Sequence, residues 1–371
     1  MVWGAWAIYV LTPLYNHLVL DDSSNLDPKV ERQHLNSKMF LLPLYAYVLA
    51  MAATHVWCLM LFSGNYDGLP GFQVKPDSAY QYFVFCVVLS FFGSLSSLAG
   101  HELVHHKQWY NKAIGNFAYT QFFYSHFWDE HTRGHHKNIA TPLDPVCHDT
   151  GVDCYSAMVK AVIGTHVTTW QREQERLSDI KNPALKLVKN RMVHYFALHC
   201  SMLAAIYHFF GTGGLKFQAA YTFTGLFWAE MVNYLEHYGL QRRKDSNGIY
   251  ESIGCMHSWN SLSSPVAFRI QRHSDHHAHV FRPYQILRRF DRAPTLPFEY
   301  ILMLFLALCP PVFFYVMDPK VKSIRDSLAG IPNPDAWSGE HSLSKADRDR
   351  HDIAVLYFIG VSIVLTGLLF I

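Results

Sequence analysis

Residues 79–106 read AYQYFVFCVVLSFFGSLSSLAGHELVHH, an apolar run that ends in a cluster of histidines. The part from Ala79 to Gly100 is long enough to cross a bilayer as a helix, which takes about 20 mostly apolar residues. On a helix, His101 and His105 are separated by about 40° of rotation, so both imidazoles project from one face. The stretch therefore predicts a membrane helix that presents two metal ligands at its end.

The composition of the whole chain agrees with a membrane protein. Of the 371 residues, 50% are apolar and only 16% are charged, against about 25% charged in ordinary globular domains. This balance excludes a disordered chain and disfavours a single soluble domain. The formal net charge of +2 predicts no nucleic-acid partner. The seven cysteines include no C-x-x-C pair, which argues against a zinc ribbon or a disulfide framework.

Several further stretches are long and apolar enough to be spans. The candidates are residues 3–20, 39–62, 79–100, 193–211, 215–236, 298–317 and 353–371. The first lacks the basic start and the cleavage site of a secretion signal, and a further helix is expected before it. Pro310-Pro311 interrupts 298–317, which we expect to be either spanning or re-entrant. Residues 1–317 then form one membrane domain, 318–352 a polar linker and 353–371 a C-terminal anchor helix.

The distribution of charge predicts the orientation of these spans. The polar segments 101–192 and 237–297 hold most of the 31 lysines and arginines, whereas the connections 63–78 and 212–214 carry only Lys75. Because cytoplasmic loops are rich in Lys and Arg, both polar segments are expected in the cytoplasm. The aromatic stretch 107–128 then reads as an interfacial or re-entrant helix, since one crossing there would separate the polar motifs on either side.

Three further histidine clusters lie at the same cytoplasmic ends of the spans. DEHTRGHH covers 129–136, NYLEHYG covers 233–239 and RHSDHH covers 272–277. Single histidines such as His55 and His199 are expected to serve packing instead. The nine candidate metal ligands are His101, His105, His131, His135, His136, His237, His273, His276 and His277. Nine ligands exceed what one ion accepts, so two metals are expected, and imidazole alone does not distinguish Zn, Cu, Fe and Ni.

Carboxylates near these clusters are expected to orient the ligand imidazoles through their N–H groups. The candidates are Glu102, Asp129, Glu130, Asp144, Glu236 and Asp275. Some of them can also bridge or bind the metals directly, and their positions in the sequence leave that open.

Two other classes of protein remain to be weighed. His101, Glu102 and His105 alone match the H-E-x-x-H motif of zinc peptidases, with Glu102 as general base. That reading leaves six or seven clustered histidines without a role. A metal transporter would line a path through the bilayer with its histidines, whereas here they gather at one edge.

Four stretches resemble the membrane-bound alkane monooxygenases, or alkane hydroxylases. They are HELVHHK (101–107), EHTRGHHKNIATPLDP (130–145), NYLEHYGLQR (233–242) and IQRHSDHHAH (270–279), within a similarity that runs from about Leu14 to Val321. The family belongs to the histidine-rich, non-haem di-iron class that includes membrane fatty acid desaturases and hydroxylases. NYLEHYG is the discriminating motif, since acyl-lipid desaturases lack this form.

The resemblance implies an all-α, multi-pass membrane bundle with two iron ions at its cytoplasmic edge. Carried over one by one, the motifs supply the nine histidines named above as iron ligands. Glu102, Glu236 and Asp275 are the acids expected to assist catalysis from behind the ligands.

The implied reaction is hydroxylation of the terminal methyl of a medium- or long-chain alkane to a 1-alcohol, with O2 and two electrons, in the inner or plasma membrane. The electrons would come from a rubredoxin-type donor with its reductase, and the lack of C-x-x-C pairs makes that donor a separate protein. A docking face or a lipid-headgroup patch is expected at Arg242, Arg243, Lys244, Arg288, Arg289 and Arg292. The alternative is a related membrane di-iron hydroxylase or desaturase acting on xylene-like, acyl-lipid or terpenoid substrates.

The chain departs from the pattern of this family at both ends. Its N-terminus looks short by about one span, and residues 353–371 lie beyond the usual end. Neither departure touches the expected ligands.

Overall fold

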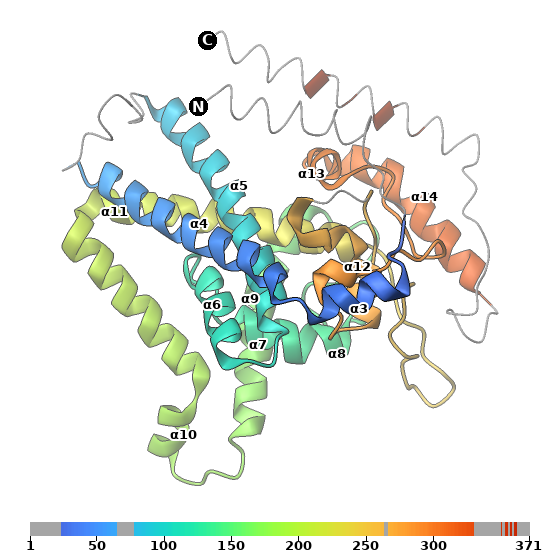
Figure 1. Ribbon diagram of the computed structural model, residues 1–371, viewed down its shortest axis with the longest axis horizontal. Coiled ribbons are helices and arrows are strands. Elements are labelled where there is room, and N and C mark those ends of the chain that lie inside the picture. Colours follow the sequence, from blue (N-terminus) through green and yellow to red (C-terminus); the bar gives the residue numbers. More distant parts are fainter. Residues whose placement is uncertain are drawn as a thin grey trace. The chain divides into compact units, whose positions relative to one another are not determined.

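In the part of the chain that the computed structural model describes, helices are joined by turns and loops (Figure 1). It describes residues 24–64, 78–262 and 266–329, together with residues 350, 353, 354, 357, 360 and 361. Within these ranges there are isolated β-bridges but no strand. The all-α fold class expected from the sequence is therefore confirmed. The expected span 3–20 lies outside the described residues, and so does most of 353–371.

The chain divides into two compact units. Unit 1 contains residues 38–134 and 162–229, and unit 2 contains the described parts of 2–37, 135–161 and 230–371. The boundaries expected from the sequence, after 317 and after 352, stay predictions.

Two long apolar helices form the first part of unit 1. Helix α4 (Leu41–Phe62) follows the short η2 (Lys38–Phe40), and α5 (Ala79–Val104) begins at the Ser78 N-cap, whose hydroxyl accepts from the Gln81 N–H. Both helices are long and apolar enough to cross a membrane, as expected for 39–62 and 79–100. Helix α5 continues four residues past Gly100, so His101 is helical and His105 is the C-cap.

Helix α6 (Trp109–Thr120) packs closely against α5. A Cβ atom added to Gly115 would lie 2.7 Å from the Gly100 carbonyl oxygen, and one added to Gly100 would lie 2.8 Å from the Gly115 carbonyl oxygen. Only hydrogen atoms fit between the two backbones at this crossing. The aromatic stretch 107–128 thus contains a helix, as expected, and that helix is locked to the histidine-bearing end of α5.

The rest of unit 1 is formed by the later part of α9 (Cys154–Arg176), by α10 (Pro183–Lys189) and by most of α11 (Arg191–His237). Helix α11 is kinked at Gly211, whose φ of 62° and ψ of −160° are not helical. Glycine adopts a positive φ without steric cost, which explains its place at the kink. The expected spans 193–211 and 215–236 are therefore two arms of one kinked helix, and the expected turn at 212–214 is reduced to this single residue. That the two arms cross a bilayer stays a prediction.

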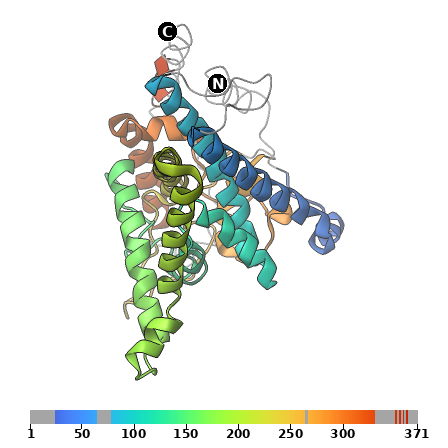
Figure 2. The ribbon, with the colours of Figure 1, turned by 90° about the vertical axis from the view of Figure 1, so that its left-hand side faces the viewer.

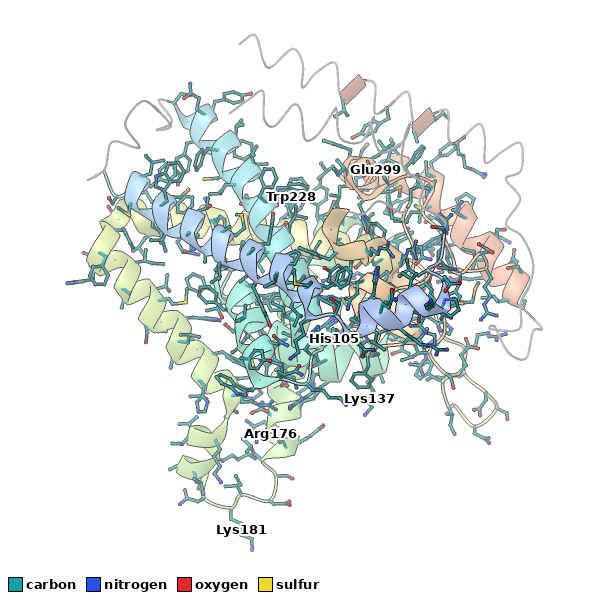
Figure 3. All side chains as sticks on the ribbon, in the orientation of Figure 1. His105, Lys137, Arg176, Lys181, Trp228 and Glu299 are labelled. Atoms are coloured by element: carbon teal, nitrogen blue, oxygen red, sulfur yellow. The ribbon has the colours of Figure 1, made fainter. Side chains whose placement is uncertain are left out.

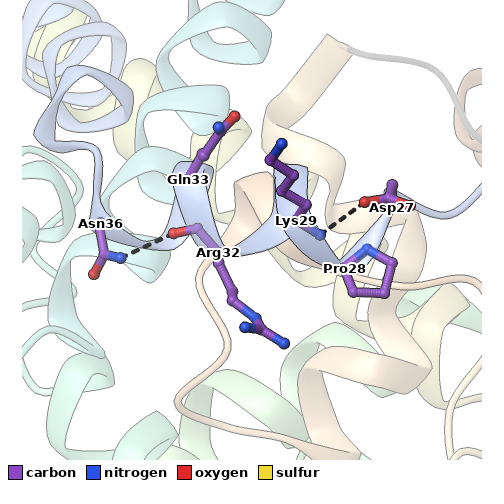
Figure 4. Close-up of a pocket in the computed structure, with 6 residues that line it drawn as sticks. All are labelled: Asp27, Pro28, Lys29, Arg32, Gln33 and Asn36. Atoms are coloured by element: carbon purple, nitrogen blue, oxygen red, sulfur yellow. Dashed lines mark hydrogen bonds between the residues drawn. The ribbon is translucent and has the colours of Figure 1, made fainter.

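Unit 2 consists mostly of short elements. After α8 (His136–Asn138) it contains η4 (Val266–Arg272), α12 (His273–Ala278) and η5 (Tyr284–Ile286), with α3 (Pro28–Asn36) from the N-terminal part. A hollow on α3 is lined by polar groups, among them Asp27, Arg32 and Gln33 (Figure 4). Its chemistry does not suit a hydrocarbon.

The expected break at Pro310-Pro311 is present in unit 2. Helices α13 (Tyr300–Ala307) and α14 (Pro310–Leu328) meet at an angle of 119°, as in a broken span or a re-entrant loop. The start of the expected polar linker is helical instead, because α14 continues to Leu328. Val321, Ile324 and Leu328 are buried and share one face of that helix, a helical periodicity that the polar composition concealed.

Candidate metal centre

Three of the nine candidate histidines converge in unit 1. His101 and His105 lie at the end of α5, and His131 follows α7 (Phe127–Glu130). The Nε2 atoms of His105 and His131 are 3.0 Å apart, and the ring centroids of His101 and His131 are 4.3 Å apart. The α-helical spacing of His101 and His105 therefore places both rings beside His131, as the sequence predicted.

Four further histidines form a buried quartet in unit 2. His135 faces His237 at the end of α11, and His273 and His277 lie one turn apart on α12. The Nε2–Nε2 distances are 3.3 Å for His135–His277, 2.9 Å for His277–His273 and 3.2 Å for His273–His237. Segments more than 100 residues apart in sequence thus present their imidazoles to one point.

The remaining two candidates, His136 and His276, form a pair within unit 2. Their Nε2 atoms are 3.1 Å apart, and both side chains are buried.

A bound cation would explain the short distances between these ring nitrogens. A neutral imidazole has one N–H and one lone pair, so a chain of four Nε2 atoms cannot satisfy every contact by hydrogen bonding. Two imidazoles at right angles on one ion, each with a metal–nitrogen distance of about 2.1 Å, place their nitrogens about 3.0 Å apart. Burial, and then the neighbouring histidines, lower the pKa of His277 well below its ordinary value. The neutral form that a metal requires is thus favoured.

A single turn of π-helix (η3, His131–His135) separates His131 from His135. Such turns are rare and occur mostly inside α-helices at functional sites. Here the first residue of the turn belongs to the triad of unit 1, and its last residue belongs to the quartet of unit 2.

Asp144 is the acid that contacts the quartet most directly. Its Oδ2 lies 2.7 Å from His135 Nδ1 and 3.0 Å from the Cys147 thiol, which donates to it. Burial alone would raise the pKa of Asp144, but the charge and the hydrogen bond of His135 outweigh it and the pKa is lowered. The same surroundings, burial foremost, raise the pKa of Cys147 well above its ordinary value. Asp144 therefore holds the His135 ring with Nε2 toward the other histidines, the orienting role that carboxylates play behind metal ligands.

Glu236 also lies against the quartet. Its Oε2 is 3.4 Å from His273 Nε2, and its Oε1 accepts a hydrogen bond of 2.8 Å from the Tyr300 hydroxyl. Tyr300 is thus a further residue at the site, which the sequence did not point to because it begins an apolar helix 64 positions away.

Glu102 and Asp275, the other two acids expected to assist catalysis, make contacts outside the nine histidines. Glu102 Oε1 lies 3.5 Å from His106 Nε2. Asp275 is fully buried, and its oxygens accept from Arg282, His279 and the Arg288 N–H. Asp275 therefore fixes α12, on which three of the histidines lie, to the chain that follows it.

Asp129 and Glu130 anchor the segment before His131 within unit 1. Glu130 Oε2 accepts from the hydroxyls of Thr168 and Thr169 and pairs with Arg172. Asp129 Oδ1 lies 3.1 Å from Arg191 Nη1. Both acids are buried, where an unpaired charge would be costly. Their partners on α9 and at the start of α11 compensate these charges.

Two single histidines set aside in the sequence bind neutral polar groups. His55 contacts Gln218 Oε1 at 2.8 Å, and His199 contacts Ser125 Oγ at 2.8 Å. Within the cationic set, Arg243 pairs with Glu251 and Arg288 pairs with Glu31. These two arginines therefore also have structural partners inside unit 2.

Comparison with known proteins agrees with this geometry. The profile of the fatty acid desaturase family matches residues 78–306, which contain all nine histidines. The chain is 32% identical to alkane 1-monooxygenase 1 of Pseudomonas aeruginosa over 85% of its own length and 82% of that protein. The chain belongs to the alkane 1-monooxygenase family. It is also 38% identical to alkane 1-monooxygenase 2 of the same organism over 62% of each chain. At 26% identity over 60% of its length it resembles the xylene/toluene monooxygenase hydroxylase component XylM of Pseudomonas putida.

Membership makes the chain a monooxygenase, as the motifs indicated. In this monooxygenase the nine histidines selected by spacing fall into the triad, the quartet and the pair, all with buried or half-buried rings. The histidine groups can bind metal, and the desaturase relationship points to non-haem iron.

Proposed function

We propose that the chain hydroxylates the terminal methyl of medium- or long-chain alkanes to 1-alcohols with O2. The names of its relatives support the substrate class, and the histidine geometry supports the chemistry. The observation that carries the proposal is the quartet, in which four Nε2 atoms approach one another to 2.9–3.3 Å in a buried site.

The nine histidines are the proposed ligands of two iron ions. The quartet can hold one ion with ligands from unit 2 alone, and the triad offers ligands to the second. His136 and His276 are the other two ligands. Iron supplies the redox chemistry that activates O2, which zinc, without redox activity, does not supply.

The surrounding residues have the tasks of orientation and exclusion of water. Asp144 orients His135, and Tyr300 holds Glu236 against His273. Glu102 and Asp275 stay as proposed supporting acids, the latter through the placement of α12. An alkane has no polar group to bind, so its methyl can be positioned only by the shape and dispersion of apolar walls. We propose that such walls come from the aromatic and aliphatic residues that pack in the core of unit 1, among them Phe85, Phe122 and Phe217.

The electron donor is proposed to be a rubredoxin-type protein with its reductase, as the family resemblance implies. The chain has no C-x-x-C pair of its own, so this donor is proposed to be a separate protein. The histidine clusters are proposed to face the cytoplasm of a cell inner or plasma membrane, since the flanking polar segments are the ones rich in Lys and Arg.

The experiment measures bound iron and 1-alcohol in membranes that contain the full chain, the donor system and dodecane. His277→Ala removes a quartet ligand, and His136→Ala removes a member of the pair; His208→Ala, an exposed histidine on α11, is the control. We expect iron and O2-dependent turnover to fall in the first two variants and to stay unchanged in the third. Undiminished iron and turnover in both ligand variants would contradict the assignment.

The similarity to the xylene/toluene monooxygenase component supports a second candidate, oxidation of an aromatic methyl group. Product analysis with dodecane, a xylene and a fatty acid separates the two. If dodecane gave no 1-alcohol while another substrate was oxidised, the alkane proposal would be wrong even with a full complement of iron.

A further inference from the structure

Helix α9 has an exposed apolar face in the segment that the sequence assigns to the cytoplasm. Ile163, Val167 and Trp170 follow one another at helical spacing, with exposed fractions of 59%, 47% and 42%. No Asp, Glu, Lys or Arg occurs between Lys160 and Arg172. The opposite face of the same turns, with Thr165 and Thr169, is buried. On a protein in water, a contiguous exposed apolar face of this kind marks a site of contact with another protein or with a membrane.

The C-terminal end of α9 is clamped to the start of α11 by the buried carboxylate of Glu173 and two arginines. Glu173 accepts from the Arg191 guanidinium and from the Arg191 backbone N–H at 2.8 Å. Arg176 binds the other end of the α10 connection, donating to the Lys189 carbonyl at 2.7 Å and to Glu173. Glu173 on α9 and Arg191 on α11 therefore lie at the same level.

A second set of contacts repeats this alignment about two turns further along α11. Ser125 bonds His199 on α11, and its neighbour His126 lies against α9, 3.2 Å from Thr165 Oγ1 and with its ring centroid 3.7 Å from that of His166. Residues 165–173 of α9 thus run antiparallel to residues 191–199 of α11. Figure 2 shows that the two helices are connected through α10.

The first arm of α11 has the surface of a membrane-embedded helix. No Asp, Glu, Lys or Arg occurs between Arg191 and Lys216, and Phe196, Tyr207 and Phe209 are exposed by 70%, 59% and 68%. A helix that is hydrophobic all round is suited to lipid. If α11 enters the bilayer just after Arg191, residues 163–170 of α9 lie at the depth of its first turns.

We propose that Ile163, Val167 and Trp170 of α9 face the lipid of the cytoplasmic leaflet, so that α9 is a helix partly embedded in the membrane. The uncharged stretch of α9 is about 16 Å long at 1.5 Å per residue, roughly half of a hydrocarbon core of about 30 Å. Trp170 lies near its outer end, the level that tryptophan prefers at membrane surfaces. Beyond the clamp, Lys181, Lys186 and Lys189 offer cations to anionic headgroups (Figure 3 labels Arg176 and Lys181). The charges of Arg176 and Arg191 are compensated by Glu173, and Arg191 also pairs with Asp129.

The test uses full-length protein in liposomes of phosphatidylethanolamine and phosphatidylglycerol, with the exposed Cys200 replaced by serine. A nitroxide is attached to a single new cysteine at Ile163 or Val167. Glu175→Cys, exposed on the same helix but outside the apolar face, is the aqueous control, and Phe196→Cys on α11 is the lipid reference. Collision with O2, which concentrates in lipid, is compared with collision with a water-soluble nickel complex.

We expect the ratio of O2 to nickel collisions at Ile163 and Val167 to match that at Phe196 and to exceed that at Glu175 several-fold. A ratio like that of Glu175 would place the face in water, and exclusion of both reagents would place it against protein; either result overturns the proposal. A water-exposed label at Phe196 overturns it as well, because α11 would then lie outside the bilayer.

Tryptophan quenching gives a second measurement that needs no label. Brominated acyl chains should quench Trp170, so Trp170→Phe should reduce the quenchable part of the emission. Equal quenching in the parent and the variant would contradict the proposal. Neither measurement requires metal or turnover, so the outcome is independent of the proposed reaction.

Discussion

The orientation of one imidazole depends on one carboxylate in unit 2. Asp144 Oδ2 lies 2.7 Å from His135 Nδ1, and His135 Nε2 lies 3.3 Å from His277 Nε2. The two ring nitrogens are thus assigned opposite tasks, one toward protein and one toward the proposed metal. Loss of such a partner typically costs 10–100-fold in metal affinity.

Asp144→Asn should therefore weaken iron binding by about one order of magnitude while the chain still folds. The amide keeps the size of the side chain, and hence its packing beside Cys147, but loses the charge that orients His135. Iron per chain, measured during titration with a chelator, checks this. Asp149→Asn, on the same segment and paired with Arg325 away from the histidines, is the matched control. Equal iron retention in both variants would show that His135 needs no carboxylate.

The residue scale also shows what the sequence could predict about the site. Histidine spacing was sufficient to select rings that converge at His101 and His105 and at His273 and His277, because residues i and i+4 on an α-helix share a face. It did not reveal the π-helical turn through which His131 and His135 belong to different groups. The spacing of residues in the sequence does not predict which partner a carboxylate binds, because the direction of its side chain depends on the fold. Asp275 occurs among three ligands in the sequence yet binds Arg282, whereas Tyr300, far from every motif, reaches Glu236.

Glu251 makes the stability of the loop after α11 dependent on pH. Burial alone would raise its pKa, but hydrogen bonds from His257 and Arg243 outweigh it and lower the pKa to about 2. A carboxylate with a depressed pKa stabilises the fold above its ordinary titration range and loses that effect as the pH falls toward the folded value. Glu251→Gln should lower the free energy of unfolding by on the order of 1 kcal/mol at neutral pH, because the charges of Glu251 and Arg243 are both partly solvated.

The corresponding measurement is the thermal unfolding midpoint of parent and Glu251→Gln protein between pH 7 and pH 3. The difference should be constant down to about pH 5 and shrink below the ordinary glutamate pKa of about 4.3. Asp326→Asn, at an exposed ion pair with Lys322, should change the midpoint little at any pH. A difference that grew in acid would have the wrong sign for this account.

At the scale of elements, two glycines determine how the histidine-bearing end of α5 is held. The backbones of α5 and α6 meet at Gly100 and Gly115, where a Cβ on either residue would lie within 3 Å of the opposite carbonyl oxygen. Because the opposing atoms are backbone, they cannot yield without moving a whole helix. His101 directly follows Gly100, so a displaced helix displaces a proposed ligand.

Gly115→Ala should therefore destabilise the protein by about 1–3 kcal/mol, the usual cost of an overpacked contact, and should lower its iron content. Ala113→Val enlarges an exposed position of the same helix and serves as the control. Unfolding midpoints and iron analysis of both variants check the expectation. Unchanged stability in Gly115→Ala would show that α6 is not packed against α5 as described.

Elements with uniform composition were predictable, and those with mixed composition were not. Helices α4 and α5 contain long apolar runs and match the predicted spans. Helix α9 was missed because its apolar positions alternate with threonine, glutamine and paired charges, which lower the average hydropathy without disturbing the face. The helical start of the predicted linker was missed for the same reason.

At the scale of the whole molecule, the proposed ligands are distributed over both units, with three in unit 1 and six in unit 2. The histidines of unit 1 end α5 or follow α7. Those of unit 2 end η3, begin α8, end α11 or lie on α12. Every one of these positions is next to a polar segment that the charge distribution assigns to the cytoplasm. On this assignment, the Lys- and Arg-rich segments that determine the topology would also place all nine histidines on one side of the membrane.

The topology predicts which positions a membrane-impermeant maleimide can reach in intact cells. Ser78→Cys, at the start of α5 on the opposite side, should be labelled before lysis. Lys107→Cys and Lys244→Cys, each beside a histidine motif, should be labelled only after permeabilisation. Cys200→Ser removes an exposed native thiol, and that variant without a new cysteine measures background labelling. If Lys107 and Lys244 were labelled on opposite sides of the membrane, the nine histidines could not share one metal centre, because a bilayer would separate the motifs beside them.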